Sequence, residues 1–125
     1  MIKGEKIDIL LLFLTTLFLY IKNLSPSVYG GDSGDFLSAA ATYGVAHPSG
    51  FPLYTMLGIL FLKLPLIASP AWKFGLVSVI TSSLTVVFIF LMTHLINKER
   101  LLYLTTAFLV AFAFPFWLYA ETVEV

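Results

Sequence analysis

Two aspartates, Asp32 and Asp35, lie in a short glycine-rich polar segment, residues 29–35, that directly follows an apolar stretch. Ionisable side chains are costly to keep beside a membrane, so such a pair predicts a functional site by default. A carboxylate in a partly dehydrated site has a raised pKa and can accept a proton from a hydroxyl nucleophile. We therefore predict that Asp32 is a general base and that Asp35 is a second catalytic residue.

Each aspartate also has a purely structural interpretation. Asp32 can form an Asx turn with Ser33 or Gly34. Asp35 can cap a short helix predicted over about Phe36–Tyr43, because aspartate is favoured at helix N-termini. Glycines around Asp32 allow a tight turn that presents its carboxylate, and both interpretations of each residue stay open.

A second polar cluster, residues 46–52, contains His47. Pro48 follows this histidine and biases its backbone toward an extended conformation. The imidazole can donate a hydrogen bond to a phosphate or orient a carboxylate, and the alternative is a histidine satisfied at the membrane interface. We predict one active-site loop in which Asp32, Asp35 and His47 are the catalytic candidates.

Further polar and aromatic residues are candidates for substrate binding: Tyr43, Tyr54, Lys63 and Glu121. The tyrosine rings can stack on a sugar or belong to an interfacial aromatic belt. The lysine can pair with a lipid phosphate or extend its ammonium group to the interface. The glutamate can join the site as part of a second loop or lie at a solvated helix end.

The composition indicates an integral membrane protein. Of the 125 residues, 59% are hydrophobic and only 11% are charged, far from the balance of a soluble domain. The formal net charge is zero, so the chain lacks the basic footprint of a nucleic-acid partner. There is no cysteine, and His47 and His94 lie far apart, so we predict no metal site.

Apolar segments predict an all-α integral membrane domain over residues 1–125, with spans at about 7–23, 74–96 and 101–120. Pro115 lies in the last turns of the third span, where a kink is tolerable. The segment 51–67 is also apolar but contains two prolines and a lysine. We predict that it is a membrane-dipping helix and not a fourth span.

Basic residues predict the orientation of these spans. They precede the first span and fill the tight turn at 97–100, and cytoplasmic loops carry an excess of such residues. Both groups are cytoplasmic only if two spans separate them, which makes residues 24–73 one long extracytoplasmic loop. The protein is then multi-pass, and its candidate site faces the same compartment as Glu121 and Glu124.

The two polar clusters resemble the N-terminal signature of a membrane family long catalogued as a domain of unknown function. The family pattern is roughly G-D-S-G-E followed by G-V-A-H-P-P-G-Y-P, which residues 31–35 and 44–52 resemble closely. This chain departs from the pattern at three positions, with Asp35 for Glu, Ser49 for Pro and Phe51 for Tyr. The family has the GT-C glycosyltransferase architecture and includes the vertebrate endoplasmic-reticulum O-mannosyltransferase that acts on plexin-type receptor domains.

The resemblance implies that the chain is the N-terminal part of a longer, GT-C-like multi-span protein. It implies transfer of a sugar, in an O-mannosyl type of reaction, from a polyprenyl-phosphate donor in the bilayer to a protein or glycan acceptor. Asp32 matches the acidic residue of the first extracytoplasmic loop, and His47 and Lys63 are candidates to steady the phosphate leaving group. The lipid-linked sugar is a co-substrate, and no cofactor or metal is implied.

Two other classes of protein are alternatives to the enzyme. The first is a fragment of a transporter or channel, in which acidic residues inside the spans would carry protons or cations. The second is a non-catalytic membrane subunit. The concentration of polar residues in one loop, with spans almost free of charge, favours the glycosyltransferase.

Overall fold

The computed structural model describes residues 3–124, and within that range every regular element is a helix. The prediction of an all-α fold is therefore confirmed. The helices are α1 (Lys3–Asn23), α2 (Ser33–Thr42), α3 (Pro52–Leu62), α4 (Pro70–Ile96), α5 (Arg100–Ala111) and α6 (Phe114–Ala120).

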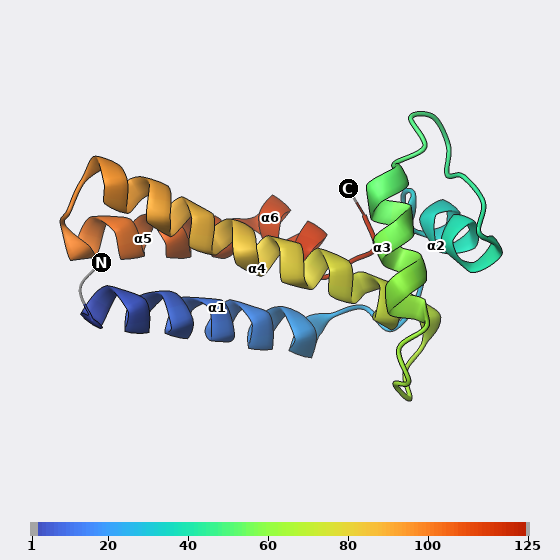
Figure 1. The fold of residues 1–125 in the computed structure, drawn as a ribbon, viewed down its shortest axis with the longest axis horizontal. Helices are drawn as coiled ribbons and strands as arrows, with labels where there is room; N and C mark the ends of the chain where they lie inside the picture. Colours follow the sequence, from blue (N-terminus) through green and yellow to red (C-terminus); the bar gives the residue numbers. More distant parts are fainter. Residues whose placement is uncertain (1–2, 125) are drawn as a thin grey trace.

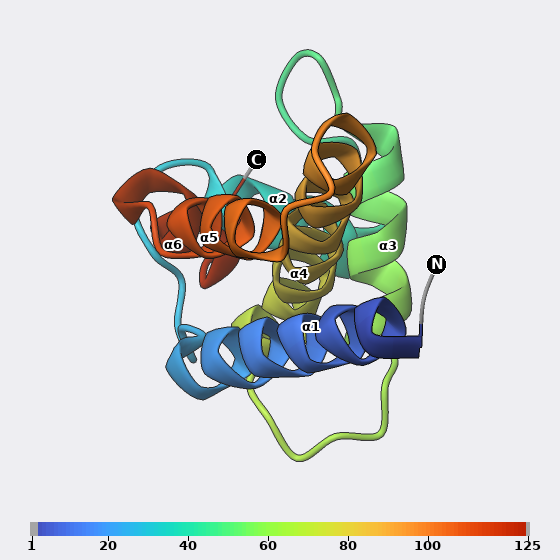
Figure 2. The ribbon, with the colours of Figure 1, turned by 90° about the vertical axis from the view of Figure 1, so that its left-hand side faces the viewer.

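Helix α4 is the centre of the fold and packs against α1, α3, α5 and α6 (Figure 1). Helices α1 and α5 run along its length, and Figure 2 shows them on different sides of it. The short helices α2 and α3 pack together at the N-terminal end of α4. The molecule thus has an elongated helical part and, at one end, a smaller part that contains the predicted active-site loop.

Local signals fix the start of α4. Ser69 is its N-cap, and the hydroxyl oxygen of this serine accepts a hydrogen bond of 3.1 Å from the backbone N–H of Trp72. Pro70 then occupies the first turn, where its fixed φ suits a helix and its missing N–H has no cost. The helix therefore begins four residues before the predicted span at 74–96.

The core beside the predicted loop is aromatic and tightly packed. Phe36 of α2 and Phe74 of α4 are fully buried at its centre. Gly58 of α3 has no side chain in the way of the Phe74 ring, so α3 lies close against α4. This close contact gives the loop between α2 and α3 a rigid base.

Helix α3 is shorter than the predicted segment 51–67. It ends at Leu62 with Lys63 as its C-cap, and Pro65 cannot continue it. Its 11 residues are too few for a span, which needs about 20. That α3 dips into a membrane stays a prediction.

The segment predicted as the third span, 101–120, is divided between two helices, and its crossing of a membrane stays a prediction. Helices α5 and α6 are bent by 63° at a break around Phe112 and Ala113. Pro115 does not kink a running helix but lies in the first turn of a new one. The hydroxyl of Tyr20 donates a 2.8 Å hydrogen bond to the carbonyl oxygen of Ala111, which stabilises the helix end at the break.

One helix among the described residues, α4, is long and apolar enough to cross a membrane by itself. Its 27 residues include a stretch of mean hydropathy 2.3. The bent pair α5 and α6 gives a second crossing if it is taken as one span. Charged residues near both ends of α1 leave only Ile9–Ile21 free of charge, so a crossing by this helix stays a prediction.

Ionic contacts join α1, α4 and α5 at the end of the molecule away from α2 and α3. Asp8 accepts hydrogen bonds of 2.9 and 2.6 Å from the guanidinium of Arg100. Nε2 of His94 lies 3.5 Å from a carboxylate oxygen of Glu5. These residues, Glu5, Asp8, His94 and Arg100, are named the distal ionic cluster.

Candidate active site

The glycine-rich turn before α2 brings Asp32 to the start of that helix. Gly31 has a φ of +69°, a left-handed conformation that glycine adopts without strain. Helix α2 begins at Ser33, three residues before the predicted start at Phe36. The prediction that Asp35 caps this helix is wrong, because Asp35 lies inside its first turn and Asp32 is the N-cap residue.

The N-terminus of α2 is capped by a residue from far along the chain. The side chain of Asp32 makes no capping hydrogen bond. Instead, its backbone N–H donates to Oε1 of Glu124 over 3.1 Å, and the Ser33 hydroxyl lies 3.3 Å from Oε2 of the same carboxylate. A negative charge is favourable at a helix N-terminus, so Glu124 fixes the backbone that carries Asp32.

His47 lies between the two aspartates. Oδ2 of Asp35 accepts a 2.8 Å hydrogen bond from the backbone N–H of His47 and lies 2.8 Å from Nδ1 of its ring. The other ring nitrogen, Nε2, is 3.5 Å from Oδ2 of Asp32. The structure thus brings the predicted catalytic residues together, and with Glu124 we name them the Asp–His cluster.

Aromatic rings beneath the cluster hold the imidazole in place. The ring of Phe36 lies 5.6 Å from that of His47, and the ring of Phe51 lies 5.4 Å away, between centroids. The imidazole side chain remains 36% exposed and the Asp32 side chain 54% exposed. Aromatic rings therefore support one side of the Asp–His cluster, and its exposed side is open to a substrate.

Hydrogen bonding and charge shift the pKa values within the cluster. The backbone and ring hydrogen bonds from His47 lower the pKa of Asp35. The hydrogen bond to Asp35 raises the pKa of His47 most. Burial partly opposes this rise, and the charges of Asp32, Asp35 and Glu124 each add a smaller increase. The imidazole is thus biased toward its charged form among acidic side chains.

Tyr43 and Lys63 contact each other at the far end of α2. Tyr43 ends the helix in a left-handed conformation, with a φ of 57°, and its ring is exposed. The ammonium nitrogen of Lys63 lies 5.4 Å from the centroid of this ring, a cation–π contact. Within the described residues, neither side chain has a hydrogen bond or ion pair to the Asp–His cluster.

Tyr54 belongs to the core below the site. Its ring packs against Phe36 and Phe74, with centroids 5.1 and 4.9 Å apart, and its hydroxyl lies 3.0 Å from the Ser78 hydroxyl. This position supports the ring beneath His47 and does not present the Tyr54 ring to a substrate.

Glu121, which was predicted to bind substrate, lies apart from the Asp–His cluster. Its backbone carbonyl accepts a 3.0 Å hydrogen bond from Ser25, and one of its carboxylate oxygens is buried without a hydrogen-bond partner. Burial raises the pKa of Glu121, an effect that the side chains of Trp117 and Asn23 oppose. Glu124 reaches the cluster instead. The sequence signal for it is the polar run after the third apolar segment, which Glu121 shares.

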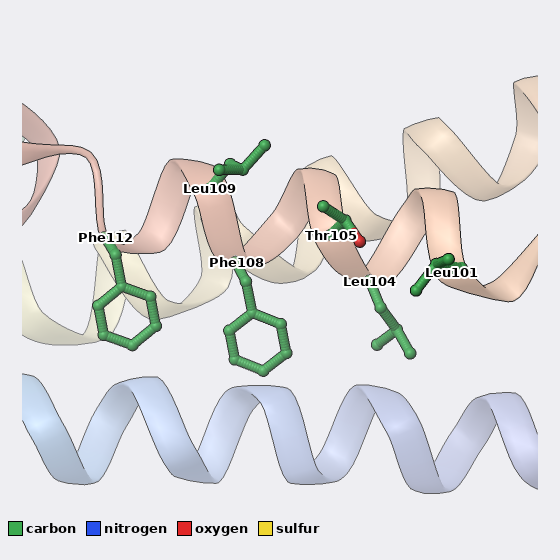
Figure 3. A pocket seen from close by; sticks show the side chains of 6 residues that line it. All are labelled: Leu101, Leu104, Thr105, Phe108, Leu109 and Phe112. Carbon is green, nitrogen blue, oxygen red and sulfur yellow. The ribbon is translucent and has the colours of Figure 1, made fainter.

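Two surface hollows are relevant here, and only the smaller one adjoins the Asp–His cluster. One hollow of about 480 Å³ lies along α5 and is almost wholly apolar, and Figure 3 shows Phe108 and Phe112 pointing toward α1. A smaller hollow of about 180 Å³ includes Gly31 and Glu124 and so adjoins the Asp–His cluster. Across residues 3–124, no group of three or more acidic, histidine or cysteine side chains is arranged to hold a metal ion.

Comparison with known proteins places these features in a family. A family model described as the protein O-mannosyl-transferase TMEM260 N-terminal domain matches residues 32–125, which include the whole Asp–His cluster. No solved structure matches the chain.

Two relatives have related names. The protein O-mannosyl-transferase tmem260 of Dictyostelium discoideum is 35% identical over 119 residues, which are 94% of this chain and 14% of the relative. The protein O-mannosyl-transferase TMEM260 of Mus musculus is 39% identical over 64 residues, which are 51% of this chain and 9% of the relative. The chain thus spans a small part of each relative's length, and by its match over residues 32–125 it belongs to the family of the TMEM260 N-terminal domain.

Proposed function

We propose that this chain is the N-terminal part of a glycosyltransferase that moves a mannosyl group from a polyprenyl-phosphate donor to a hydroxyl of a protein acceptor. The acceptor side of the membrane is extracytoplasmic in this proposal, as the basic residues around the spans predict. The names of the relatives support the transferase class and the protein acceptor. The position of His47 between Asp32 and Asp35, inside the matched segment, is the observation that carries the proposal.

Asp32 is the general base in this reaction. The acceptor oxygen forms a bond to the anomeric carbon of the donor, and the hydroxyl proton passes to the Asp32 carboxylate. The bond between the anomeric carbon and the phosphate oxygen breaks, and polyprenyl phosphate leaves with the bonding electrons. Asp32 suits this role because its carboxylate is half exposed and its backbone is fixed by Glu124.

His47 and Asp35 position the base. The two contacts to Asp35 fix the imidazole, and the opposite ring nitrogen then faces one oxygen of Asp32. The other oxygen of Asp32 is left to meet the acceptor hydroxyl. A charged imidazole also places positive charge near the reacting atoms, where the phosphate develops negative charge as it leaves.

The test is transfer by the full-length protein with Asp32→Asn. The assay measures mannosyl transfer from polyprenyl-phosphate mannose to a serine- and threonine-containing protein acceptor. We expect kcat to fall about 10²–10⁴-fold, the usual contribution of a general base, with an unchanged thermal unfolding midpoint. The matched control is Glu99→Gln, an exposed carboxylate at the start of α5, and wild-type turnover by Asp32→Asn would falsify the assignment of the base.

A further inference from the structure

The small hollow beside the Asp–His cluster contains two tyrosines that the mechanism above does not use. It is formed by the turn before α2 on one side and by α6 with the segment after it on the other. Its lining residues are Tyr29, Gly30, Gly31, Leu118, Tyr119, Thr122 and Glu124. We name it the Tyr29–Tyr119 pocket.

Both tyrosines of this pocket have unused binding capacity. Tyr29 is 53% exposed and Tyr119 is 51% exposed. In the part of the chain that the structure describes, neither makes a ring contact and neither hydroxyl has a hydrogen-bond partner. The buried Tyr20 and half-buried Tyr54 differ, because their hydroxyls contact the Ala111 carbonyl and the Ser78 hydroxyl.

Glu124 brings a charged hydrogen-bond acceptor to the same pocket. Its carboxylate comes close to the backbone because Gly31 has no Cβ, which would lie only 2.6 Å from Oε1. The two oxygens contact Asp32 and Ser33. An ionised carboxylate has about four acceptor positions, so Glu124 can accept further hydrogen bonds from a ligand in the pocket.

The size and chemistry of the pocket fit one monosaccharide ring. Its volume of about 180 Å³ is below the roughly 300–1,000 Å³ of sites for drug-sized ligands. A hexose presents C–H faces that pack on aromatic rings and hydroxyls that donate to a carboxylate. Two half-exposed tyrosines and one carboxylate supply both kinds of contact.

We propose that the Tyr29–Tyr119 pocket binds the hexose of the lipid-linked donor, an inference that rests on the proposed function. Gly31, in the pocket wall, precedes Asp32 in the chain, and Glu124 contacts both the pocket and the backbone of Asp32. A hexose held here lies against the turn that carries the general base. The pocket therefore recognises the group that is transferred, while the lipid phosphate binds elsewhere.

Tyr119→Ala and Tyr29→Ala in the full-length protein test this assignment. We expect each to raise KM for polyprenyl-phosphate mannose at least tenfold. The inhibition constant of sugar-free polyprenyl phosphate should stay at the wild-type value, because this inhibitor has no hexose. Phe114→Ala is the matched control, since Phe114 is an exposed aromatic residue of α6 outside the pocket.

An unchanged KM in both tyrosine variants would overturn the assignment. So would an equal rise in KM and in the inhibition constant, because the pocket would then contact the lipid phosphate. Two other results would instead contradict the proposed function: full transfer by Asp32→Asn, or no transfer by the wild-type protein.

A binding experiment tests the pocket without turnover. Saturation-transfer NMR on the full-length protein should show contact with methyl α-mannoside, and Tyr119→Ala should abolish the signal. Absence of the signal in the wild-type protein, or its persistence in the variant, contradicts the assignment whether or not the enzyme turns over.

Discussion

The Asp–His cluster and the distal ionic cluster lie at opposite ends of the elongated fold, and each places one histidine against carboxylates (Figure 1). In the distal cluster, Asp8 is only 7% exposed, its carboxylate is paired with Arg100, and His94 is buried. In the Asp–His cluster the side chains are one third to one half exposed, and several carboxylates surround a single imidazole.

This difference in exposure indicates different roles: the distal ionic cluster holds helices together, and the Asp–His cluster is arranged for chemistry. In the distal cluster the Asp8 carboxylate and the His94 imidazole are buried between helices and each contacts a partner side chain, so these two groups are closed to a ligand, although the Arg100 side chain is 68% exposed. Unbalanced charges on a glycine-containing turn remain accessible, and groups with shifted pKa values in such places are candidates for function. Histidine with carboxylates is therefore not a sufficient sign of a site, and the exposure of the histidine and its carboxylate partners decides between the two interpretations.

The sharpest test of this comparison is to remove each histidine in turn. His47→Ala should lower kcat by about 10²-fold, because the Asp32 carboxylate loses the group that positions it. The thermal unfolding midpoint should fall only slightly, since the side chain is partly exposed. Wild-type kcat, or a clear loss of stability, would show that His47 is structural.

His94→Ala should have the opposite effect. The His94 ring packs against Phe90 and Tyr103, with centroids 6.4 and 5.0 Å away, and its loss should lower the free energy of unfolding by about 2 kcal/mol. Transfer per folded molecule should not change. His94→Phe is the control: if packing accounts for the effect, it restores most of the stability, and a transfer defect in either variant would contradict the comparison.

A smaller effect is expected at the turn that carries Asp32. Gly31→Ala forces an alanine into a left-handed conformation, at a cost of about 1 kcal/mol, and its Cβ would displace the Glu124 carboxylate. We expect slower transfer and a slightly lower unfolding midpoint. Gly30→Ala is the matched control, because a Cβ there meets nothing within 4 Å, and equal behaviour of the two variants would exclude this role of Gly31.

The smallest expected effect is a dependence of stability on pH. The pKa of His47 is raised in the folded state, so its contribution is complete below about pH 6.5 and is lost as the pH rises through the folded pKa. The pKa of Asp35 is lowered, so its contribution is present above about pH 4 and is lost as the pH falls through the folded pKa. The pair therefore stabilises the fold most between these limits.

NMR titration of the His47 ring protons checks this prediction. The wild-type pKa of His47 should lie above the ordinary value of about 6.5, and Asp35→Asn should move it down. The same variant should also flatten the dependence of the unfolding midpoint on pH. An identical His47 titration in both proteins would show that the contact with Asp35 is absent in solution.

Local sequence determines much of this architecture. The apolar runs and the polar loop with Asp32 and His47 could be predicted, because each depends on neighbouring residues. The Ser69-Pro70 start of α4 is also a local signal, but the predicted span began four residues after it. The break between α5 and α6 could not be placed correctly, since it depends on Tyr20 of a different helix bonding to the carbonyl of Ala111.

The contacts that complete the candidate site are long-range and could not be predicted in detail. Glu124 caps α2 from 92 positions away along the chain, so no local pattern distinguishes it from Glu121. The same limit applies to Tyr54, whose place in the core depends on Phe74 and Ser78 of α4. The capping prediction for Asp35 failed because α2 begins three residues earlier than predicted, which places Asp35 inside its first turn.

The hydrogen bond from Asp32 to Glu124 also has a consequence for the time at which the site forms. Ribosomes add about 5–20 residues per second, and 92 positions separate the two partners. The turn at Asp32 therefore leaves the ribosome several seconds before the residue that caps it. During that interval the nascent loop has its catalytic side chains but lacks the contact that fixes them. Synthesis itself therefore delays assembly of the site until the third apolar segment and Glu124 have followed.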